Sequence, residues 1–338
     1  MTREPVLTFT DKGIYCPSGG FFIDPWRAVD RALITHAHSD HARWGHGHYL
    51  STPGTDAVMR HRLGAINGQV LGFDVPLVVN GVTVSFHPAG HVPGSAMIRV
   101  ERGGEVWVVS GDYKVDPDGL AEPWAPVRCD TFISECTFGL PVFRWETNTA
   151  SMARIAAWWR GNAAQGITSI IGAYSLGKAQ RLMVGLAAIG VGPILCHTAV
   201  EATNAALRGA GYALPDTVHA GAGFDARANA GALVICPPAA LGSAWAAKFG
   251  PRDEAAASGW MALRGVRRRR GTTGFVISDH ADWPGLNMAI REMGAQRVFV
   301  THGYTSQFRR WLEAEGYQAG IVATEYVGDA AEEEEVTA

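Results

Sequence analysis

The stretch Thr35-His36-Ala37-His38-Ser39-Asp40-His41 follows a short apolar run and holds four metal-ligand side chains within six residues. Imidazole and carboxylate groups together suit zinc or a similar first-row divalent ion. We expect a strand over Leu33–Thr35 and a helical segment after it, so the backbone turns here and the side chains can converge. A polar surface loop that merely contains histidines is the alternative, but these residue types rarely cluster without a metal. The stretch therefore predicts a metal site.

More distant ligands are required, because one loop cannot complete the coordination of two metals. His91, Asp112 and His302 each follow an apolar run and lie beside a glycine. A side chain in that setting can project from a sheet edge where the backbone packs closely. Taken alone, each could equally be a turn histidine or a capping aspartate. The other histidines lack this setting and are expected to be structural or exposed; they are His46, His48, His61, His87, His197 and His219.

The chain changes character twice along its length. Its first part has short strands joined by tight turns, and Asn80-Gly81 and Gly103-Gly104 predict two β-hairpins. From about Ala150, apolar strands alternate with helices in the rhythm of a parallel α/β unit. The expected elements there are strands over Ile167–Ile171, Pro193–Cys196 and Leu233–Cys236 and helices over Leu176–Ile189 and Val200–Arg208.

After the basic run Arg267–Arg270 the first style returns. Strands are expected over Phe275–Ser278, shortly before His280, and over Arg297–Thr301, directly before His302. The simplest organisation is one core interrupted by an inserted α/β domain. We expect core segments over residues 1–145 and 273–330, the insertion over 146–272, and a disordered acidic tail over 331–338.

Composition limits the possible partners and the compartment. The 338 residues are 47% hydrophobic, enough for a sizeable core, and the net charge is only -3. A polyanion would therefore have to bind at a local patch. Five cysteines without a CxxC pair, and no apolar leader, indicate a reducing cytoplasm. The apolar runs end well before the roughly 20 residues of a membrane span, so no membrane partner is expected.

Two basic segments are candidates for such a patch. Ser175 and Lys178 lie at the start of an expected helix, where backbone N–H groups can bind phosphate, and Arg181 adds positive charge. An ordinary helix cap with solvated basic residues explains the same pattern. Arg267–Arg270 could steer a polyanion or could form a solvated loop.

Taken in order, the His36–His41 loop, His91 and Gly111-Asp112 resemble the motifs of the metallo-β-lactamase superfamily. The segments Ser134–Gly139, Ile277–His280 and Val300–Gly303 resemble three further motifs of its β-CASP nuclease branch, and Ala173–Gln180 resembles that branch's inserted domain. The resemblance extends from about Asp24 to about Gly303. Around Thr35–Arg43 and Ser278–Trp283 the amino-acid sequence resembles that of bacterial ligase-associated DNA exonucleases.

The resemblance implies a four-layer αββα sandwich, with two mixed β-sheets flanked by helices and an inserted α/β domain. It also implies two divalent metal ions, zinc or manganese. The implied ligands are His36, His38 and His91 for the first ion, Asp40, His41 and His302 for the second, and Asp112 between them.

The same resemblance assigns roles to other residues. Asp24, which ends Phe21–Ile23, would support the ligands without binding a metal itself. His280 would protonate the leaving oxygen and Glu135 would orient His280. Asp40 belongs to the catalytic set as well as to the ligands.

The implied activity is two-metal hydrolysis of DNA, as an exonuclease in repair acting on single strands or free ends, with the 5′ end as the expected start. The implied partners are an ATP-dependent DNA ligase and its associated repair proteins. His302 and Glu135 instead match RNA-processing members, so a ribonuclease on the same scaffold stays open. A thioester or lactam hydrolase would need neither the inserted domain nor the His280 and Glu135 motifs. An inactive binding module would have lost ligands, and none is missing.

Overall fold

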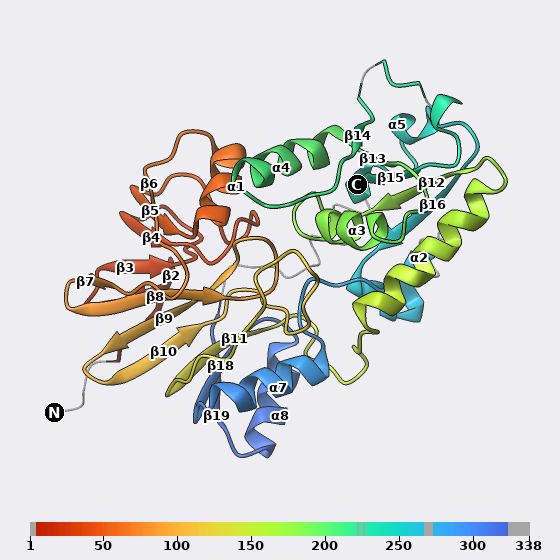
Figure 1. Cartoon of the computed structure of the whole chain (residues 1–338). Helices are drawn as coiled ribbons and strands as arrows, with labels where there is room; N and C mark the ends of the chain where they lie inside the picture. The colour runs from red at the N-terminus through yellow and green to blue at the C-terminus, as the bar shows by residue number, and fades with distance from the viewer. Residues whose placement is uncertain (1–4, 222, 226, 267–272, 324–338) are drawn as a thin grey trace. The chain divides into compact units, whose positions relative to one another are not determined.

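The chain forms two compact units built from three β-sheets (Figure 1). A computed structural model describes residues 5–221, 223–225, 227–266 and 273–323. Of these, unit 1 takes residues 5–117, 121–142 and 280–323, and unit 2 takes the rest. The mixed α/β class expected from the sequence is confirmed. The chain leaves unit 1 after Val142 and returns to it at His280.

Unit 1 contains two mixed sheets. Sheet A has the order β1-β2-β3-β4-β5-β6, with strands Thr8–Thr10, Gly13–Cys16, Phe21–Ile23, Arg31–Leu33, His48–Ser51 and Gly68–Val70. Sheet B has the order β19-β18-β11-β10-β9-β8-β7. In chain order from β7 to β11 and then β18 and β19, its strands are Leu77–Val79, Val82–Pro88, Ala96–Arg102, Glu105–Val109, Thr131–Cys136, Arg297–Gly303 and Gln318–Ile321. Because β18 pairs in parallel with β11, residues 297–321 complete the sheet that residues 77–136 begin.

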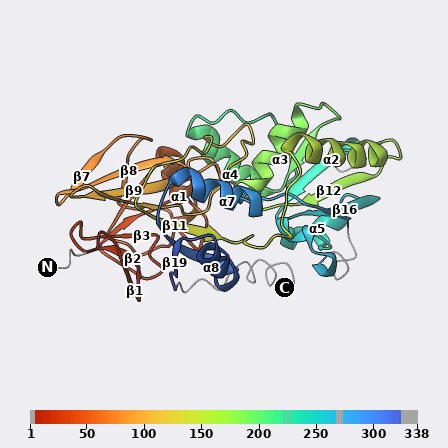
Figure 2. The same cartoon turned by 90° about the horizontal axis from the view of Figure 1, so that it is seen from below.

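Alternation of apolar side chains along the strands gives unit 1 its core. Phe21 and Ile23 of sheet A share one buried cluster with Phe86 and Ile98 of sheet B, so the two sheets pack through one face each. The other face of sheet B is covered by α7 (Trp283–Met293) and α8 (Thr305–Ala314). Figure 1 shows these helices beside β11, β18 and β19, and Figure 2 shows α8 beside β19 from below. Helix α1 (Pro53–Leu63) contacts β6 of sheet A.

Both predicted hairpins are confirmed. Asn80 and Gly81 have φ values of 50° and 79° and join β7 to β8, and Gly103 and Gly104 have 57° and 82° and join β9 to β10. Two consecutive positive φ values are the mark of the type I′ turn, which matches the twist of the flanking strands.

Unit 2 is built on sheet C, in which every pairing is parallel. The order is β14-β13-β15-β12-β16-β17, with β12 to β17 at Thr168–Gly172, Ile194–Cys196, Val218–His219, Leu233–Cys236, Arg252–Ala257 and Thr273–Phe275. Helices α2 (Asn148–Ala163), α3 (Lys178–Ala187) and α4 (Thr198–Gly209) pack on one face, and the segment around α5 (Ala244–Ala247) packs on the other. The described residues of unit 2 also form short 3-10 helices at Arg227–Asn229, Pro238–Ala240 and Gly259–Ala262.

Four expected elements differ from the observed ones. Strand β4 ends at Leu33, and residues 35–41 form turns instead of opening a helix, because the Thr35 N–H donates to the Asp24 carboxylate. Helix α3 begins at Lys178, two residues later than expected. The strand expected over 275–278 lies instead at Thr273–Phe275 and pairs with β16 of sheet C, because Phe275 is buried in the core of unit 2. Arg267–Arg270 and the acidic tail lie outside the described residues.

In the described part of the chain, no helix is both long and apolar enough to cross a membrane. None of the five cysteines forms a disulfide. Burial raises the pKa of Cys129 to about 12 and also raises the pKa of Cys136, Cys196 and Cys236. A thiol with a raised pKa is seldom ionised near neutral pH and is therefore a weak nucleophile. The cytoplasmic location inferred from cysteine usage stays a prediction.

Candidate metal and acid–base site

Asp24 fixes the shape of the Thr35–His41 loop. Its carboxylate accepts hydrogen bonds from the Thr35 N–H at 2.8 Å and the Thr35 hydroxyl at 2.5 Å, and it lies 2.7 Å from His41 Nδ1. Asp24 has a φ of 42°, a conformation that non-glycine residues adopt where the surroundings enforce it. Asp24 therefore holds both ends of the loop and orients one of its imidazoles.

A first cluster joins His36, His38, His91 and Asp112. His38 Nδ1 lies 3.2 Å from His36 Nε2 and 3.1 Å from His91 Nε2, and His36 Nε2 lies 3.4 Å from Asp112 Oδ2. In a tetrahedral zinc site with bonds of about 2.0–2.1 Å, neighbouring ligand atoms are roughly 3.3–3.4 Å apart. The four side chains are thus spaced as ligands of one cation.

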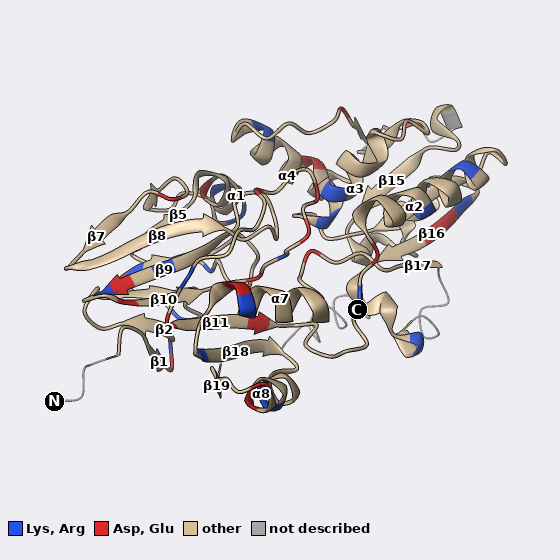
Figure 3. Ribbon diagram, turned by 60° about the horizontal axis from the view of Figure 1, so that its bottom comes forward, with Lys and Arg blue, Asp and Glu red and all other residues tan. Residues whose placement is uncertain are grey.

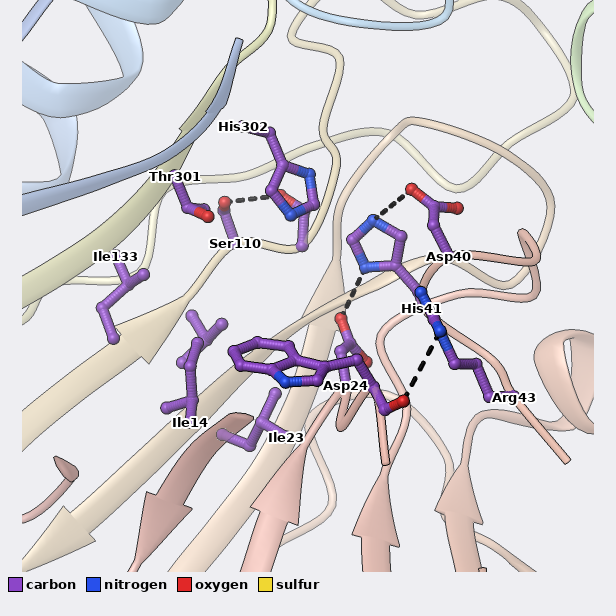
Figure 4. Close-up of a pocket in the computed structure, with 13 residues that line it drawn as sticks. Ile14, Ile23, Asp24, Asp40, His41, Arg43, Ser110, Ile133, Thr301 and His302 are labelled. Atoms are coloured by element: carbon purple, nitrogen blue, oxygen red, sulfur yellow. Dashed lines mark hydrogen bonds and ion pairs between the residues drawn. The ribbon is translucent and has the colours of Figure 1, made fainter. Parts of the chain in front are cut away.

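A second cluster joins Asp40, His41 and His302. His41 Nε2 lies 3.4 Å from Asp40 Oδ2, and His302 Nδ1 lies 3.8 Å from Asp112 Oδ1. Figure 4 shows the His41 ring reaching Asp40 on one side and Asp24 on the other, with His302 across a small pocket. His302, with a φ of 55°, is a second site residue in the left-handed region.

Asp112 connects the two clusters. Its Oδ2 atom lies 3.4 Å from both His36 Nε2 and His41 Nε2 and 3.7 Å from His91 Nε2. The preceding Gly111 has a φ of 55°, and a Cβ atom there would lie 2.5 Å from Thr35 Oγ1. Only glycine allows β10 to approach the loop this closely, and this approach brings one carboxylate to both groups of imidazoles.

The charges in this buried site are strongly coupled. Burial alone would raise the pKa of Asp112, but His41 and His280 hold that pKa well below its usual value. Burial opposes protonation of His41, yet Asp40 and Asp112 outweigh it and raise the pKa of His41. Burial, assisted by His280, lowers the pKa of His91 well below its usual value, so His91 is neutral and able to bind a cation.

Two atoms of the site are buried without a hydrogen-bond partner, namely His41 Nε2 and Asp112 Oδ1. An unsatisfied buried polar atom costs about 1–3 kcal/mol, and a bound cation would remove that cost. Imidazole nitrogens and carboxylate oxygens are also the donors that zinc and manganese accept. The residues present therefore fit two divalent cations that share Asp112.

His280 and Glu135 form a hydrogen-bonded pair beside these clusters. His280 Nδ1 lies 2.9 Å and 3.0 Å from the two Glu135 carboxylate oxygens. The Glu135 carboxylate also accepts the N–H groups of Tyr113 at 3.0 Å and Thr137 at 3.3 Å. Glu135 is 1% exposed, so the pair is shielded from solvent on that side. Ligand-type atoms of Asp112, Glu135 and His280 lie within 4.8 Å of one another, so the pair belongs to the same site as Asp112.

Sequence reasoning missed the contacts that set the site's geometry. The Ser110 hydroxyl accepts the Glu135 N–H at 3.1 Å, and the Cys136 thiol donates to the His302 carbonyl at 2.9 Å. At Gly303, which has a φ of 75°, a Cβ atom would lie 2.4 Å from Thr137 Cα. Most of these contacts use backbone atoms, which carry no residue-specific signal. Only the glycine beside His302 could have indicated them.

The candidate substrate residues of unit 2 lie in a different environment. Ser175 follows β12, and its carbonyl accepts from Gln180 Nε2 at 2.8 Å. Lys178 is 5% exposed, with its ammonium 4.4 Å from the Tyr174 ring centroid. Arg181 is 4% exposed and donates to Asn148 Oδ1 at 2.9 Å and to the Ser278 carbonyl. Two of the three side chains are therefore buried within unit 2.

The remaining histidines have contacts that suit structural or surface roles. His87 is the most notable, because its ring bridges Ser85 at 2.8 Å and Asp74 at 2.7 Å in a Ser–His–Asp chain. Ser85 is only 6% exposed and lies within β8, so this hydroxyl is not presented to a substrate. The other contacts are local: His197 caps α4, His219 pairs with Thr198, and His46 accepts the Val29 N–H.

Relatives of this chain carry names of nucleic-acid enzymes. It is 31% identical over 314 residues to a probable DNA ligase of Opitutus terrae, covering 92% of this chain and 30% of the relative. It is 30% identical over 147 residues to a ribonuclease of Thermus thermophilus, covering 35% of this chain and 34% of the relative. It is 24% identical over 180 residues to cleavage and polyadenylation specificity factor 73 of Drosophila melanogaster, covering 50% and 26%. The chain thus spans about a third or less of each relative's length.

Other comparisons bear on the fold alone. A solved structure of a protein of unknown function from Enterococcus faecalis aligns with a TM-score of 0.58 at 11% identity, covering 88% of this chain and 79% of that one. At this identity the likeness indicates a shared fold and nothing about activity. No family model matches the chain.

Proposed function

Because the chain belongs to the β-CASP nuclease branch of the metallo-β-lactamase superfamily, we propose that it is a metal-dependent nuclease that hydrolyses phosphodiester bonds. The observation that carries the proposal is the position of Asp112. The Asp112 carboxylate lies 3.4 Å from a nitrogen of each group of imidazoles, which is the spacing of two ligands of one cation. It also lies close to the His280–Glu135 pair. A site of this kind joins two cation positions to a proton donor.

The proposed architecture is the four-layer αββα sandwich of the superfamily with a β-CASP insertion. Two features support it: sheets A and B share one core, and α7 and α8 cover the outer face of sheet B. The proposed insertion corresponds to unit 2, whose described boundaries at 142/143 and 279/280 lie close to the expected 146 and further from the expected 272.

In the proposed mechanism, His36, His38 and His91 would hold one divalent ion, Asp40, His41 and His302 would hold the other, and Asp112 would serve both. When bound, two such ions would lower the pKa of a water molecule and neutralise the charge of the phosphodiester. Asp24 keeps the His41 ring oriented through Nδ1, which leaves Nε2 for the metal side.

His280 supplies the proton that the leaving oxygen needs. Its Nδ1 atom is engaged by Glu135, so the proton is transferred from Nε2. Glu135 fixes the orientation of the His280 ring. Its hydrogen bonds from the Tyr113 and Thr137 N–H groups prevent the carboxylate from turning away. General acids of this type contribute about 10²–10⁴-fold to the rate.

The substrate proposed is DNA, trimmed from a free end during repair, with an ATP-dependent DNA ligase as partner. Support comes from the Opitutus terrae relative, which is named a probable DNA ligase and matches 92% of this chain. The second candidate substrate is RNA. It is favoured by His302, by Glu135, and by relatives named endoribonucleases and a ribonuclease. The metal ligands do not decide between them, because they contact the phosphate that both polymers share.

Ser175 and Lys178 remain the proposed contacts to the strand in unit 2. Basic and acidic residues are mixed along the helices and strands of this unit (Figure 3). Binding of a polyanion would therefore depend on single local residues, and α3 places Lys178 at its first turn. Arg181 enters the proposal through a different role, argued below.

The deciding experiment compares end-labelled DNA and RNA of matched sequence, with Mn²⁺ or Zn²⁺ added to the metal-free protein. We expect progressive release of short products from linear single-stranded DNA, with circular DNA resistant. Asp112→Asn, run beside it, controls for contaminating nucleases. Degradation of RNA alone would replace the DNA assignment, rapid cutting of circles would exclude end dependence, and no cleavage of either polymer would refute the proposal.

A further inference from the structure

The segment after His280 is anchored within unit 1. The Ala281 N–H donates to the Tyr113 carbonyl at 2.7 Å, and Tyr113 also donates its own N–H to Glu135. Asp282 then caps α7 by accepting the Gly285 N–H at 2.9 Å. One side of the His280–Glu135 pair is therefore held by the same backbone that holds its carboxylate.

The segment before His280 is anchored by Arg181. The Arg181 guanidinium donates to the Ser278 carbonyl and lies 3.7 Å from Asp279 Oδ1. On its other side it donates through Nε to Asn148 Oδ1 at 2.9 Å, which fixes the direction of the guanidinium plane. Asp279 is the residue adjacent to His280 in the sequence, so this anchor ends one peptide bond from the proposed acid.

This contact is a buried, charged one. The side chains of Arg181 and Asp279 are 5% and 4% exposed. Solvent screens such a pair little, and removal of one partner from a buried ion pair is strongly destabilising. A guanidinium presents its donors in a rigid plane, whereas a lysine ammonium is a single flexible point charge. The Arg181 guanidinium donates to the Ser278 carbonyl and faces the Asp279 carboxylate as an ion pair without a hydrogen bond. The contact is therefore suited to fixing a backbone.

We propose that Arg181 is a positioning residue for His280, acting through Ser278 and Asp279; this rests on the proposed function. Proton transfer requires the donor within about 2.6–3.2 Å of the leaving oxygen. A displacement of about 1 Å can cost on the order of 10²-fold in rate. Arg181 holds the two residues before His280 within unit 2, and the Tyr113 carbonyl holds the residue after it within unit 1.

A comparison of leaving groups separates this role from general support of the fold. A dinucleotide releases a basic alkoxide that needs a proton, whereas a p-nitrophenyl nucleotide ester releases a phenolate that does not. With the manganese-loaded protein, Arg181→Met should slow dinucleotide cleavage on the order of 10²-fold and ester cleavage less than about 3-fold. His280→Ala should show the same selectivity. Combining the two changes should add less than about 3-fold, because both act on one step.

Two conservative variants cover the possibility that Arg181→Met folds poorly. Arg181→Lys keeps the charge and should restore only part of the dinucleotide rate. Asp279→Asn keeps the size of the side chain and the hydrogen bond from Arg181 to the Ser278 carbonyl, but it removes the ion pair. The cleavage rate should fall roughly 10-fold on the dinucleotide and stay unchanged on the ester. The matched control is Arg208→Met in α4, because Arg208 also binds a loop carbonyl, that of Pro215, and a carboxylate, that of Glu201. This control should change neither rate.

Equal losses on both substrates, or a change in KM alone, would overturn the inference and leave hydrolysis itself intact. A crystal structure of Arg181→Met gives a readout that does not depend on activity. We expect the His280 ring to be displaced from Glu135. An unmoved ring would overturn the inference even if the unmodified protein cleaved neither substrate, an outcome that would by itself refute the proposed function.

Discussion

Two segments of this chain are rich in polar side chains, and they differ in the hydrogen-bond partners that those side chains have. In the Thr35–His41 loop of unit 1, imidazoles and carboxylates face one another, and His41 Nε2 is buried with no hydrogen-bond partner. In the Tyr174–Arg181 segment of unit 2, Gln180 and Arg181 are bound to protein atoms on several sides. Convergent polar atoms left unsatisfied indicate a ligand, whereas satisfied ones indicate a structural role.

The largest effect is expected where the two ligand clusters meet. Asp112→Asn keeps the shape but removes the charge that faces both groups of imidazoles. Metal content, measured by mass spectrometry, should fall from two ions to one or none. The cleavage rate should fall on the order of 10³-fold, because charge stabilisation is lost together with the metal. Full metal content in this variant would show that Asp112 is not a shared ligand.

The second-largest effect is expected at His280, and it separates proton transfer from metal binding at the same site. His280→Ala should leave both metal ions in place and slow cleavage of a natural phosphodiester by about 10²–10⁴-fold. Metal analysis and single-turnover rates on one preparation make the comparison. An unchanged rate would remove His280 from the proposed mechanism, and lost metal would make it a ligand.

A smaller effect on metal affinity is expected at Asp24, which contacts the metal-ligand candidate His41. Asp24→Asn weakens the contact to His41 Nδ1, and loss of such an orienting carboxylate typically lowers metal affinity about 10–100-fold. Competition with a fluorescent zinc chelator measures this affinity. The matched control is Asp30→Asn, because Asp30 also faces a histidine, His48 at 3.9 Å, but is largely exposed. Equal affinities in the two variants would contradict the supporting role of Asp24.

The smallest effect concerns the unit 2 segment and would sharpen the comparison most. If Lys178 contacts a phosphate, Lys178→Ala should raise KM for a long strand a few-fold and reduce the salt slope of binding by about 1. Fluorescence anisotropy at several salt concentrations measures that slope. If the slope is unchanged, the Lys178 contact with Tyr174 is structural, and the unit 2 segment carries no strand contact through this residue.

Much of the site was predictable because ligands need particular side chains. Histidine and aspartate at the ends of apolar runs led to His36, His91, Asp112 and His302, which the structure brings together. The hairpins at Asn80 and Gly103 were predictable for a similar reason, since few residues adopt two consecutive positive φ values. Ligand chemistry and local backbone conformation both depend on the identity of single residues, so both can be predicted from the sequence.

Arg181 shows where this reasoning stops. A basic residue near a helix start has the same appearance in sequence whether it binds phosphate or a carbonyl of its own protein. The strand expected over residues 275–278 failed for a related reason. Phe275 is apolar in either sheet, and only packing against Trp158, at a ring-centroid distance of 5.5 Å, settled that it belongs to sheet C.

The sequence by itself determined which chemistry this protein can carry, because ligand atoms, turn glycines and apolar periodicity are properties of single residues and their neighbours. Only the tertiary structure decided which polar groups remain unsatisfied. That property depends on partners 97 or 145 positions away, as for Arg181 with Ser278 and Glu135 with His280. Burial removes water as the default partner, so each buried polar atom must find a protein group or a ligand, and the fold alone determines which.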